Sequence, residues 1–504
     1  MSRKALPFDG LPVSSATRAF LAERHGLFID GQWRPSLSGA TLDSVDPATE
    51  LHLATVAAGG AGDIDAAVQA ATRAFHGPWS RLKARERAGL LVRLARLLER
   101  DADFFTELEI LDNGMPRFIA GLTVSNCVEM FDYYASAILR IEGVTTTPPP
   151  HVSADAEALT YTLREPVGVV GLIVPWNVPV STLTLKLAPA LAAGCTVVVK
   201  PAEETPLSAL ALARLIQEAG FPEGVVNIVN GPGETAGAAL SAHPQVDKIS
   251  FTGSTEVGRK IVQAASGNLK KVCLELGGKS PVVVMPDADL ELAGPGVSMA
   301  TFFLQGQNCM AGTRIFAHAS IHDELVARMK AFTGFFTLGH GLDAGNNFGP
   351  LIGGAHATRV LEHVDRAVAQ GATLVTGWVK LDRPGHFVPP TILTNVRPDM
   401  DIFREEVFGP VMAVHRFETE DVEEIAALAN DSVYGLSGSV WTRSLSTAHK
   451  LVSRIRSGQV SINCHGAIAT NIPFGGYKQS GWGREFGREG LDAYLETKAV
   501  TARL

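Results

Sequence analysis

Cysteine is scarce in this sequence, and the few cysteines present are not grouped. Five of them are spread over 504 residues, with no CxxC pair and no close set of cysteine and histidine. This pattern excludes a disulfide framework and a structural zinc site, and we expect no metal ion. The opening residues MSRKALPFDG contain no apolar core of signal-peptide length. We therefore expect a reducing, cytoplasmic setting.

A long uninterrupted apolar run is also missing. The most apolar region, residues 167–200, is broken by Pro175, Pro179 and Lys186. A membrane-spanning helix needs about 20 predominantly apolar residues, so these interruptions argue against a membrane protein. Short apolar runs of this kind are typical of buried strands in a parallel sheet.

Excess charge of either sign is absent as well. The net charge is −8 and charged residues make up 19% of the chain, which argues against general affinity for nucleic acid or acidic membranes. Hydrophobic residues make up 46%, and 50 glycines are present, as in an ordered globular protein with many turns. The length predicts roughly two to four domains.

The residue pattern predicts an α/β protein. Helices are expected at 63–76 and 84–110. Between 167 and 284 the strands VGVVGLIV, TVVVK, VVNIV, KISFTG and VCLEL alternate with helical segments, which predicts βαβ units and a doubly wound parallel sheet. A second α/β series follows, with strands at PVVVM, RIFAHAS, VMAVHRF, SGSVWT and QVSIN and a helix near 322–336. The stretch TTTPPP and the alternating ALTYTLRE after it predict a linker and a protruding hairpin.

Three segments near strand ends could contact a nucleotide. The loop NGPGETAG, with Gly233, resembles a dinucleotide fingerprint but has one residue too many, so a tight turn is the favoured interpretation. In KISFTGSTEVG, Gly253 and Ser254 precede a helix whose free N–H groups suit a phosphate, although a plain helix cap gives the same pattern. In VVVKPAEETP, Lys200 and Glu203 leave the carboxyl edge of the sheet, where ligands of such sheets bind. A carboxylate there accepts from ribose hydroxyls and repels a 2′-phosphate, which favours NAD over NADP.

One cysteine has the surroundings of a reactive thiol. Cys309 lies in LQGQNCMAGTR, among small polar residues rather than apolar ones. A nucleophilic thiol needs donors for a developing oxyanion and a base for the second step. Glu275, at a strand end in KKVCLELGG, supplies a carboxylate, and Asn177, between two prolines in IVPWNVP, supplies an amide donor.

These stretches together resemble the aldehyde dehydrogenase superfamily. LELGG and FFLQGQNC match its glutamate and cysteine motifs, and PWNVP, KPAEETP, FTGSTEVG, EEVFGP and PFGGYKQSGWGRE follow its order. The resemblance runs from LFIDGQW to LETKAV, nearly the whole chain. It implies a Rossmann-like NAD-binding domain at 1–145 and 165–277, a catalytic domain at 278–480, and a β-hairpin oligomerisation element at 146–164 and 490–504.

The resemblance also implies roles for individual residues. It implies that Cys309 is the nucleophile, that Glu275 is the general base, and that Asn177 with the Cys309 N–H forms the oxyanion hole. Lys186 and Glu485 resemble a proton-relay pair behind Glu275. The implied cofactor contacts are Trp176, Lys200, Glu203, Gly233, Gly253, Ser254, Glu406 and Phe408. The expected reaction is oxidation of an aldehyde to the acid through a thiohemiacetal and a thioester, with NAD favoured and NADP possible.

The expected substrate pocket is lined by Val178, Leu185, Phe303 and Ile468. Val178 and Leu185 stand where many members of the family have aromatic residues, which implies a wide apolar tunnel, suited to an aryl or a long-chain aldehyde. Two other stretches, FLAERHGLFIDG and INCHGAIATNIPFGGYKQSG, are similar to bacterial phenylacetaldehyde dehydrogenases. The absence of a Trp/Tyr cage argues against betaine aldehyde. His465 is expected near the substrate mouth.

Several alternatives remain open from the sequence. Cys273 is expected to be a packing residue, although it shares a strand face with Glu275, and Cys195 and Cys464 are expected to be structural. A CoA-acylating enzyme is disfavoured by the intact LELGG, and a cysteine esterase would leave the nucleotide motifs without a purpose. A non-catalytic binding protein on the same fold would not need the reactive residues. The resemblance implies a homodimer or homotetramer.

Overall fold

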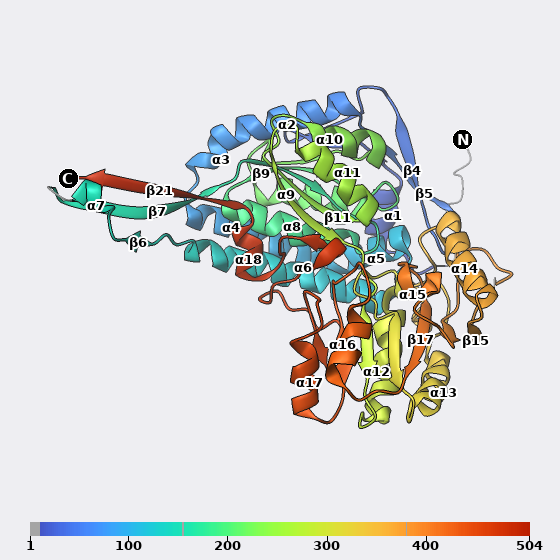
Figure 1. Cartoon of the computed structure of the whole chain (residues 1–504). Helices are drawn as coiled ribbons and strands as arrows, with labels where there is room; N and C mark the ends of the chain where they lie inside the picture. The colour runs from blue at the N-terminus through green and yellow to red at the C-terminus, as the bar shows by residue number, and fades with distance from the viewer. Residues whose placement is uncertain (1–10, 154–155, 380) are drawn as a thin grey trace, which may run out of the picture.

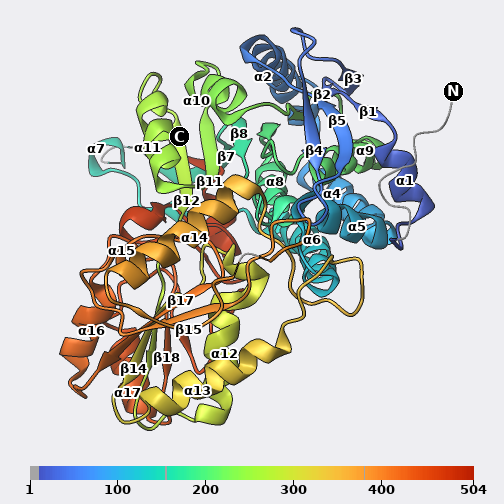
Figure 2. The same cartoon turned by 90° about the vertical axis from the view of Figure 1, so that its right-hand side faces the viewer.

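Two large mixed sheets, each covered by helices, form the body of the protein, and a narrow arm projects from it (Figures 1 and 2). The computed structural model describes residues 11–153, 156–379 and 381–504. The opening segment MSRKALPFDG and residues 154–155 of the expected hairpin lie outside the described residues. Among the residues that are described, no helix combines the length and the apolar character needed to cross a membrane.

The first sheet has eight strands in the order β20-β12-β11-β8-β9-β10-β2-β3. Its five central strands are parallel and match the predicted ones: β8 (Val169–Ile173), β9 (Thr196–Lys200), β10 (Val226–Ile228), β11 (Lys248–Gly253) and β12 (Lys271–Leu276). The edges are antiparallel, with β20 (Gly481–Trp482) beside β12, and β2 (Leu27–Ile29) and β3 (Gln32–Arg34) beyond β10. The predicted parallel sheet is therefore confirmed for the five strands at 167–284, and antiparallel strands from outside this range extend it at both edges.

Alternating side chains of the central strands pack on opposite faces of this sheet. Val197 and Val199 belong to one core cluster and Val198 to another, as the two-residue period of a strand requires. One face is covered by α2 (Ala61–His76), α10 (Ala238–Ala242) and α11 (Thr255–Ala265). The other is covered by α4 (Ala84–Arg100), α6 (Arg117–Ala137), α8 (Pro179–Ala193) and α9 (Leu207–Ala219). Burial on both faces explains why the strands read as continuous apolar runs.

Some predicted helices differ in their limits. The expected helix at 84–110 is two helices, α4 and α5 (Ala102–Asn113), because Asp101 lies outside helical geometry at φ −101° and ψ 19°. The helix expected near 322–336 ends earlier, since α13 (His322–Phe332) is followed by a 3₁₀ turn at Thr333–Phe335. The segment after Pro232 is a short π turn, Gly233–Gly237, that leads into α10.

The second sheet has seven strands in the order β15-β16-β17-β14-β13-β18-β19. They are β13 (Pro281–Val284), β14 (Arg314–His318), β15 (Thr373–Thr376), β16 (Thr391–Thr394), β17 (Val411–Phe417), β18 (Ser439–Trp441) and β19 (Ser461–Ile462). All neighbours are parallel except β15 and β16. The helices of this half are α12 (Leu290–Phe302), α13, α14 (Gly354–Ala369), α15 (Asp401–Arg404), α16 (Val422–Asn430) and α17 (Leu445–Val452).

The arm is a three-stranded sheet whose strands come from distant parts of the chain. β7 (Ala158–Pro166) pairs along its whole length with β21 (Leu495–Arg503), and β6 (Thr145–Thr146) adds a short third strand. Figure 1 shows the arm projecting from the body with the C-terminus at its tip. The expected hairpin is therefore short, and the chain end supplies the longer partner of β7.

The remaining elements are small. A further three-stranded sheet has the order β1-β5-β4. It is made of β1 (Arg24–His25), β4 (Thr41–Val45) and β5 (His52–Ala57). The short helices are α1 (Ser15–Leu21), α3 (Pro78–Arg81), α7 (Pro150–Ser153) and α18 (Gly487–Asp492).

Candidate active site

A cavity of about 280 Å³ lies where the two large sheets meet. The first sheet presents the carboxyl ends of its parallel strands there, because the lining residues come at or just after the ends of β8, β11 and β12. The second sheet presents amino ends, because Cys309 precedes β14 and Glu406 precedes β17. The lining residues are Pro175, Trp176, Asn177, Thr252, Gly253, Ser254, Glu275, Gly277, Cys309, Arg359, Glu406, Val407 and Phe408.

Eight residues singled out in the sequence therefore line one cavity. They are Trp176, Asn177, Gly253, Ser254, Glu275, Cys309, Glu406 and Phe408. The other expected site residues do not line it: Lys186, Glu485, Lys200, Glu203, Gly233, Val178, Leu185, Phe303 and Ile468.

Cys309 is a half-buried thiol at the end of a strained loop. Leu304 and Gln305 have φ of 55° and 57°, and Gly306 has φ of 68°. A side chain at Gly306 would place Cβ 2.2 Å from the carbonyl oxygen of Gly409, so the cysteine loop packs tightly on the segment that carries Glu406. Such backbone outliers are typical of sites that a fold must hold in one geometry.

The thiol holds its proton firmly in this structure. Burial raises the pKa of Cys309 well above its usual range, and the nearby Glu275 and Glu406 carboxyls add to the effect. Because the thiolate is the nucleophile, attack by Cys309 requires a base that removes its proton or a cation that offsets the two carboxyls.

Glu275 is a buried carboxyl with an uncommitted oxygen. Its side chain is 3% exposed, and Oε1 has no hydrogen-bond partner among the described residues. Its pKa is raised to about 8, chiefly by burial and also by Glu485, while Lys186 acts in the opposite direction. A carboxyl with a pKa near neutral pH can both accept and release a proton, as a general base must.

Lys186 and Glu485 form an ion pair that is closed off from solvent. The Lys186 ammonium donates to Glu485 Oε1, and Lys186 is 0% and Glu485 5% exposed. Ser250 Oγ donates to the same Glu485 oxygen at 3.4 Å. Glu485 Oε2 has no partner within the described parts of the chain. The pair lies outside the cavity and acts electrostatically on Glu275.

Asn177 presents its side-chain amide to the cavity while one of its N–H groups is already engaged. Asn177 Nδ2 donates to the carbonyl oxygen of Gln307 at 2.9 Å, and the residue is 6% exposed. An amide nitrogen carries two hydrogens, so a second donor remains for an oxyanion beside Cys309.

The two glycines after Glu275 allow Glu406 and the backbone of Cys309 to lie close to the turn. A Cβ at Gly277 would lie 1.9 Å from Glu406 Oε2, and a Cβ at Gly278 would lie 2.5 Å from the Cys309 carbonyl oxygen. The Gly278 N–H also donates to Glu406 Oε1 at 2.9 Å. Burial raises the pKa of Glu406 to about 7, against the effect of this N–H and of Lys279. The two glycines of the LELGG motif therefore lie in close contact with both Cys309 and Glu406.

An aromatic wall and a cation complete the cavity, and the cation was missed in the sequence. Trp176 makes edge contacts with Phe408 and His356, with ring centroids 5.3 and 5.5 Å apart. The Phe408 carbonyl accepts from His356 Nε2 at 2.8 Å. Arg359, one turn further along α14, contacts His356 Nδ1 at 2.7 Å and lines the cavity. No local motif marks Arg359, since it lies on an ordinary polar helix face.

A second group of expected cofactor contacts lies together at the edge of the first sheet. Lys200 Nζ donates to Glu203 Oε2 at 2.5 Å, and Glu203 Oε1 accepts from the Gly233 N–H at 3.1 Å. Ser254 caps α11 by accepting from the Val257 N–H at 3.3 Å. The loop that contains Gly233 and the KPAEETP segment are therefore neighbours. This proximity is expected if both segments contact the same ligand.

The expected substrate-pocket residues fall into two groups. Val178, Leu185 and Phe303 are partly buried and pack against the same core cluster as Cys309. Ile468 is 42% exposed, in the loop after β19.

The other cysteines and His465 differ in their surroundings. Cys195 and Cys273 are buried, whereas Cys464 is exposed. Burial raises the pKa of Cys273. His465 bonds to the Met310 carbonyl oxygen at 2.8 Å and to Ser439 Oγ at 2.9 Å, which braces the cysteine loop.

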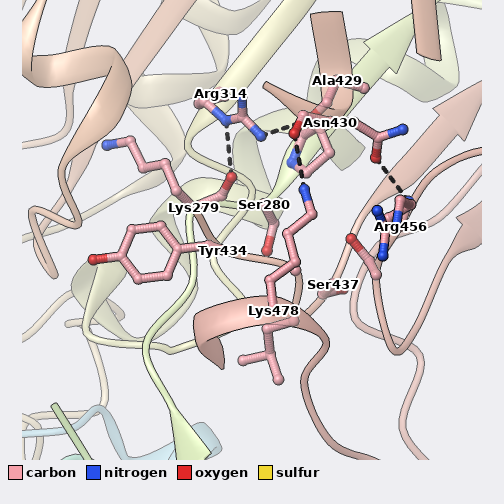
Figure 3. Close-up of a pocket in the computed structure, with 13 residues that line it drawn as sticks. Lys279, Ser280, Arg314, Ala429, Asn430, Tyr434, Ser437, Arg456 and Lys478 are labelled. Carbon is pink, nitrogen blue, oxygen red and sulfur yellow. Dashed lines mark hydrogen bonds between the residues drawn. The ribbon is translucent and has the colours of Figure 1, made fainter. Parts of the chain in front are cut away.

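A second pocket beside the turn that follows β12 is built from cations (Figure 3). Arg314 donates to the carbonyl oxygens of Lys279 and Ala429 at 2.9 and 2.8 Å, and Lys478 donates to that of Asn430 at 2.8 Å. The pocket leaves no room for a water-sized ligand. These cations therefore anchor backbone around the site and do not form a binding site themselves.

Comparison with known proteins identifies the family. The sequence model of the Aldehyde dehydrogenase family matches residues 33–500. The chain is 46% identical over 496 residues to Aldehyde dehydrogenase 1 of Tanacetum cinerariifolium, covering 98% of each chain. It is 44% identical over 483 residues to the mitochondrial aldehyde dehydrogenase of Homo sapiens, covering 95% of this chain and 92% of the other. The solved NAD+ complex of an aldehyde dehydrogenase from Bacillus cereus superposes with a TM-score of 0.95 at 42% identity, covering 98% of this chain and 99% of that one. The expected fold is confirmed, and this chain belongs to the aldehyde dehydrogenase family.

Proposed function

We propose that this protein oxidises an aldehyde to the carboxylic acid, with NAD as the hydride acceptor and water as the second reactant. The observation that carries the proposal is that Cys309, Asn177 and Glu275 line one cavity together with Glu406. Family membership and the NAD+ complex of the Bacillus cereus relative support the coarse assignment, an NAD-dependent aldehyde dehydrogenase.

The residues present suit a dinucleotide. Two carboxylates, Glu406 and Glu203, can each accept from the hydroxyls of a ribose, and the helix that begins after Ser254 offers free N–H groups to a phosphate. Glu203 would repel a 2′-phosphate, which favours NAD over NADP. When bound, NAD supplies the hydride acceptor, and the protein supplies position and electrostatics. We propose Trp176, Lys200, Gly233, Gly253 and Phe408 as further contacts.

The chemistry follows from three side chains. The Glu275 carboxylate, which is within hydrogen-bond reach of Cys309, takes the proton of the thiol. The Cys309 Sγ then attacks the aldehyde carbon, while the second N–H of Asn177 stabilises the alkoxide that forms. Departure of a hydride from this thiohemiacetal leaves a thioester on Cys309. Glu275 then takes a proton from water, the hydroxide attacks the thioester, and the acid leaves with the thiolate restored. The Lys186–Glu485 pair tunes the charge on Glu275 and is proposed as the relay that carries its proton away.

We propose an aryl aldehyde such as phenylacetaldehyde as the substrate, with a medium- or long-chain aliphatic aldehyde as the alternative. Val178, Leu185 and Phe303 support an apolar approach to Cys309, since all four pack on one core cluster. Ile468 is proposed at the mouth. Specificity constants for phenylacetaldehyde, benzaldehyde and hexanal test this assignment. A clear preference for hexanal would contradict it.

The family resemblance and the arm support a homodimer or homotetramer. We keep the domains at 1–145 with 165–277, at 278–480, and at 146–164 with 490–504 as proposals, together with a cytoplasmic setting. A cysteine esterase on the same fold remains the rival reading. Ester hydrolysis without NADH formation from any aldehyde would favour that rival.

A further inference from the structure

We propose that Asn113, which does not line the cavity, is a positioning residue that holds the oxyanion donor Asn177 in place; this inference rests on the proposed function. Asn113 is the last residue of α5 and is 0% exposed. Its Nδ2 donates to the carbonyl oxygens of Trp176 at 2.7 Å and of Asn177 at 3.3 Å. One amide group therefore holds two successive peptide units of the catalytic loop.

The catalytic loop needs such support because it has little of its own. It lies between Pro175 and Pro179, neither of which has a backbone N–H to donate. Val178, the residue before α8, has φ −143° and ψ 69° and provides no side-chain cap for the helix. Glu109, one turn before Asn113 on α5, accepts from the Val180 N–H at 3.3 Å. The end of α5 thus holds the loop at both of its ends.

The same turn of α5 also contacts the segment that fixes the cysteine loop. Gln307, whose carbonyl accepts from Asn177, is held by the Ile352 N–H at 2.9 Å and by the Pro350 carbonyl at 3.4 Å. Pro350 packs on Gly114, where a Cβ would lie 2.7 Å from Pro350 Cγ. Gly114 has φ of 87°, which favours glycine.

These contacts make a closed circuit. From Asn113 it runs through the Asn177 loop to Gln307, on to Pro350, and back to Gly114. The donor amide therefore has its backbone fixed by α5 and its side chain fixed by the cysteine loop. An oxyanion donor must lie within about 2.7–3.1 Å of the oxygen it stabilises, so a displacement near 1 Å lowers the rate by about 10²-fold.

The test is a double-mutant cycle on single-turnover NADH formation. The variants are Asn113→Ser, Asn177→Ala and the pair, in the full-length protein with NAD and its best aldehyde. If Asn113 acts through Asn177, Asn113→Ser alone lowers the rate by about 10²-fold. In the Asn177→Ala background the same change lowers it by less than about threefold. If the rate loss of the double variant equals the product of the losses in the two single variants, the two residues act independently and the proposal is wrong.

Asn227→Ser is the matched control. Asn227 is also 0% exposed, and its Nδ2 also donates to two carbonyl oxygens, those of Val197 at 3.2 Å and Gly224 at 2.8 Å. It has no link to the catalytic loop, and its variant is expected to keep the wild-type rate within about threefold. An equal loss in Asn227→Ser would mean that any buried asparagine matters, and would overturn the assignment.

A near-isosteric variant separates positioning from folding. Asn113→Leu keeps a similar side-chain shape but has no donor for either carbonyl, so it should lower the rate as much as Asn113→Ser does. Both variants are checked by thermal unfolding. If neither keeps a cooperative transition, Asn113 is a folding residue and the proposal is wrong. Failure of the proposed function can be distinguished from failure of the Asn113 proposal, because in the first case the wild-type protein itself would form no NADH.

Discussion

At the scale of single residues, the site brings together groups that would repel one another if all were charged. Cys309, Glu275 and Glu406 lie around one cavity, and burial raises the pKa of each. The neutral forms are therefore favoured before the reaction begins. Raised pKa values of this kind are typical of groups that exchange protons near neutral pH.

Hydrolysis of the acyl-enzyme should rise with pH toward 8. The pKa of Glu275 is raised to about 8, so below that value most of the carboxyl carries a proton and cannot accept one from water. The deacylation rate is expected to increase about tenfold from pH 6 to pH 7 and to level off above about 8. Rapid-quench measurement of acid release after acylation checks this.

Glu275→Gln is the control for the pH profile. It should lower deacylation by about 10²–10⁴-fold and remove the rise with pH. A wild-type rate that stays constant from pH 6 to pH 8 would contradict the assignment of Glu275 as the base.

A larger side chain at Val178 should narrow the approach to Cys309. Val178 is half-buried and packs on the core beside the nucleophile. Overpacking costs about 1–3 kcal/mol, so Val178→Phe is expected to lower kcat/KM for phenylacetaldehyde about tenfold and for hexanal less. Equal losses for both substrates would reject Val178 as a pocket residue.

Residues that lie within a distinctive motif are the ones that the sequence could bring together. Cys309, Glu275 and Asn177 stand in distinctive stretches, and all three line the cavity. Arg359 could not be predicted in this way, because it reaches the site through the placement of α14 and not through its neighbours in the chain.

At the scale of elements, the turn after β12 decides how the two sheets meet. Gly277 faces Glu406, and Gly278 faces the carbonyl of Cys309. Each lacks the atom that would push the second sheet away from the first. The turn thus couples the strand that carries Glu275 to the loops that carry Cys309 and Glu406.

Gly277→Ala should weaken cofactor use. Its Cβ would meet Glu406 Oε2 at 1.9 Å, so Glu406 must move. At an overpacking cost of about 1–3 kcal/mol, KM for NAD is expected to rise about tenfold, with a smaller change in thermal stability. Steady-state kinetics with varied NAD measures this.

Gly267→Ala provides the comparison for that variant. Gly267 is exposed, and a Cβ there would meet only the Ala264 carbonyl oxygen, at 3.5 Å. KM for NAD should stay at the wild-type value. A normal KM in Gly277→Ala as well would remove Glu406 from the cofactor site.

Elements were predictable where burial leaves a simple pattern. The five central strands of the first sheet are covered on both faces and read as apolar runs. The edge strand β20 was not predicted, because it is only two residues long and its partner β12 lies about two hundred residues earlier. The break at Asp101 was missed because the apolar period continues from α4 into α5.

At the scale of the whole molecule, the arm projects from the body (Figure 1) and has exposed apolar side chains. β21 lies at one edge of its sheet, and Leu159 and Leu163 on β7 are 42% and 40% exposed. Exposed strand edges and apolar side chains are ready sites for another chain. This supports assembly of the protein through the arm.

The assembly should depend on the face of β7. Light scattering is expected to give a mass that is a multiple of 53.5 kDa for the wild type. Leu159→Asp with Leu163→Asp should shift it toward a single chain, because charged side chains disfavour an apolar contact. Leu445→Asp, on α17 and 70% exposed, should leave the mass unchanged. A single-chain mass for the wild type would contradict the proposal.

The most direct measurement is NADH formation by the purified protein with a panel of aldehydes, with NAD and with NADP, beside Cys309→Ala. We predict NAD-dependent turnover of aryl aldehydes that is lost in Cys309→Ala. No NADH from any aldehyde, with hydrolysis of an activated ester intact, would contradict the account and favour an esterase.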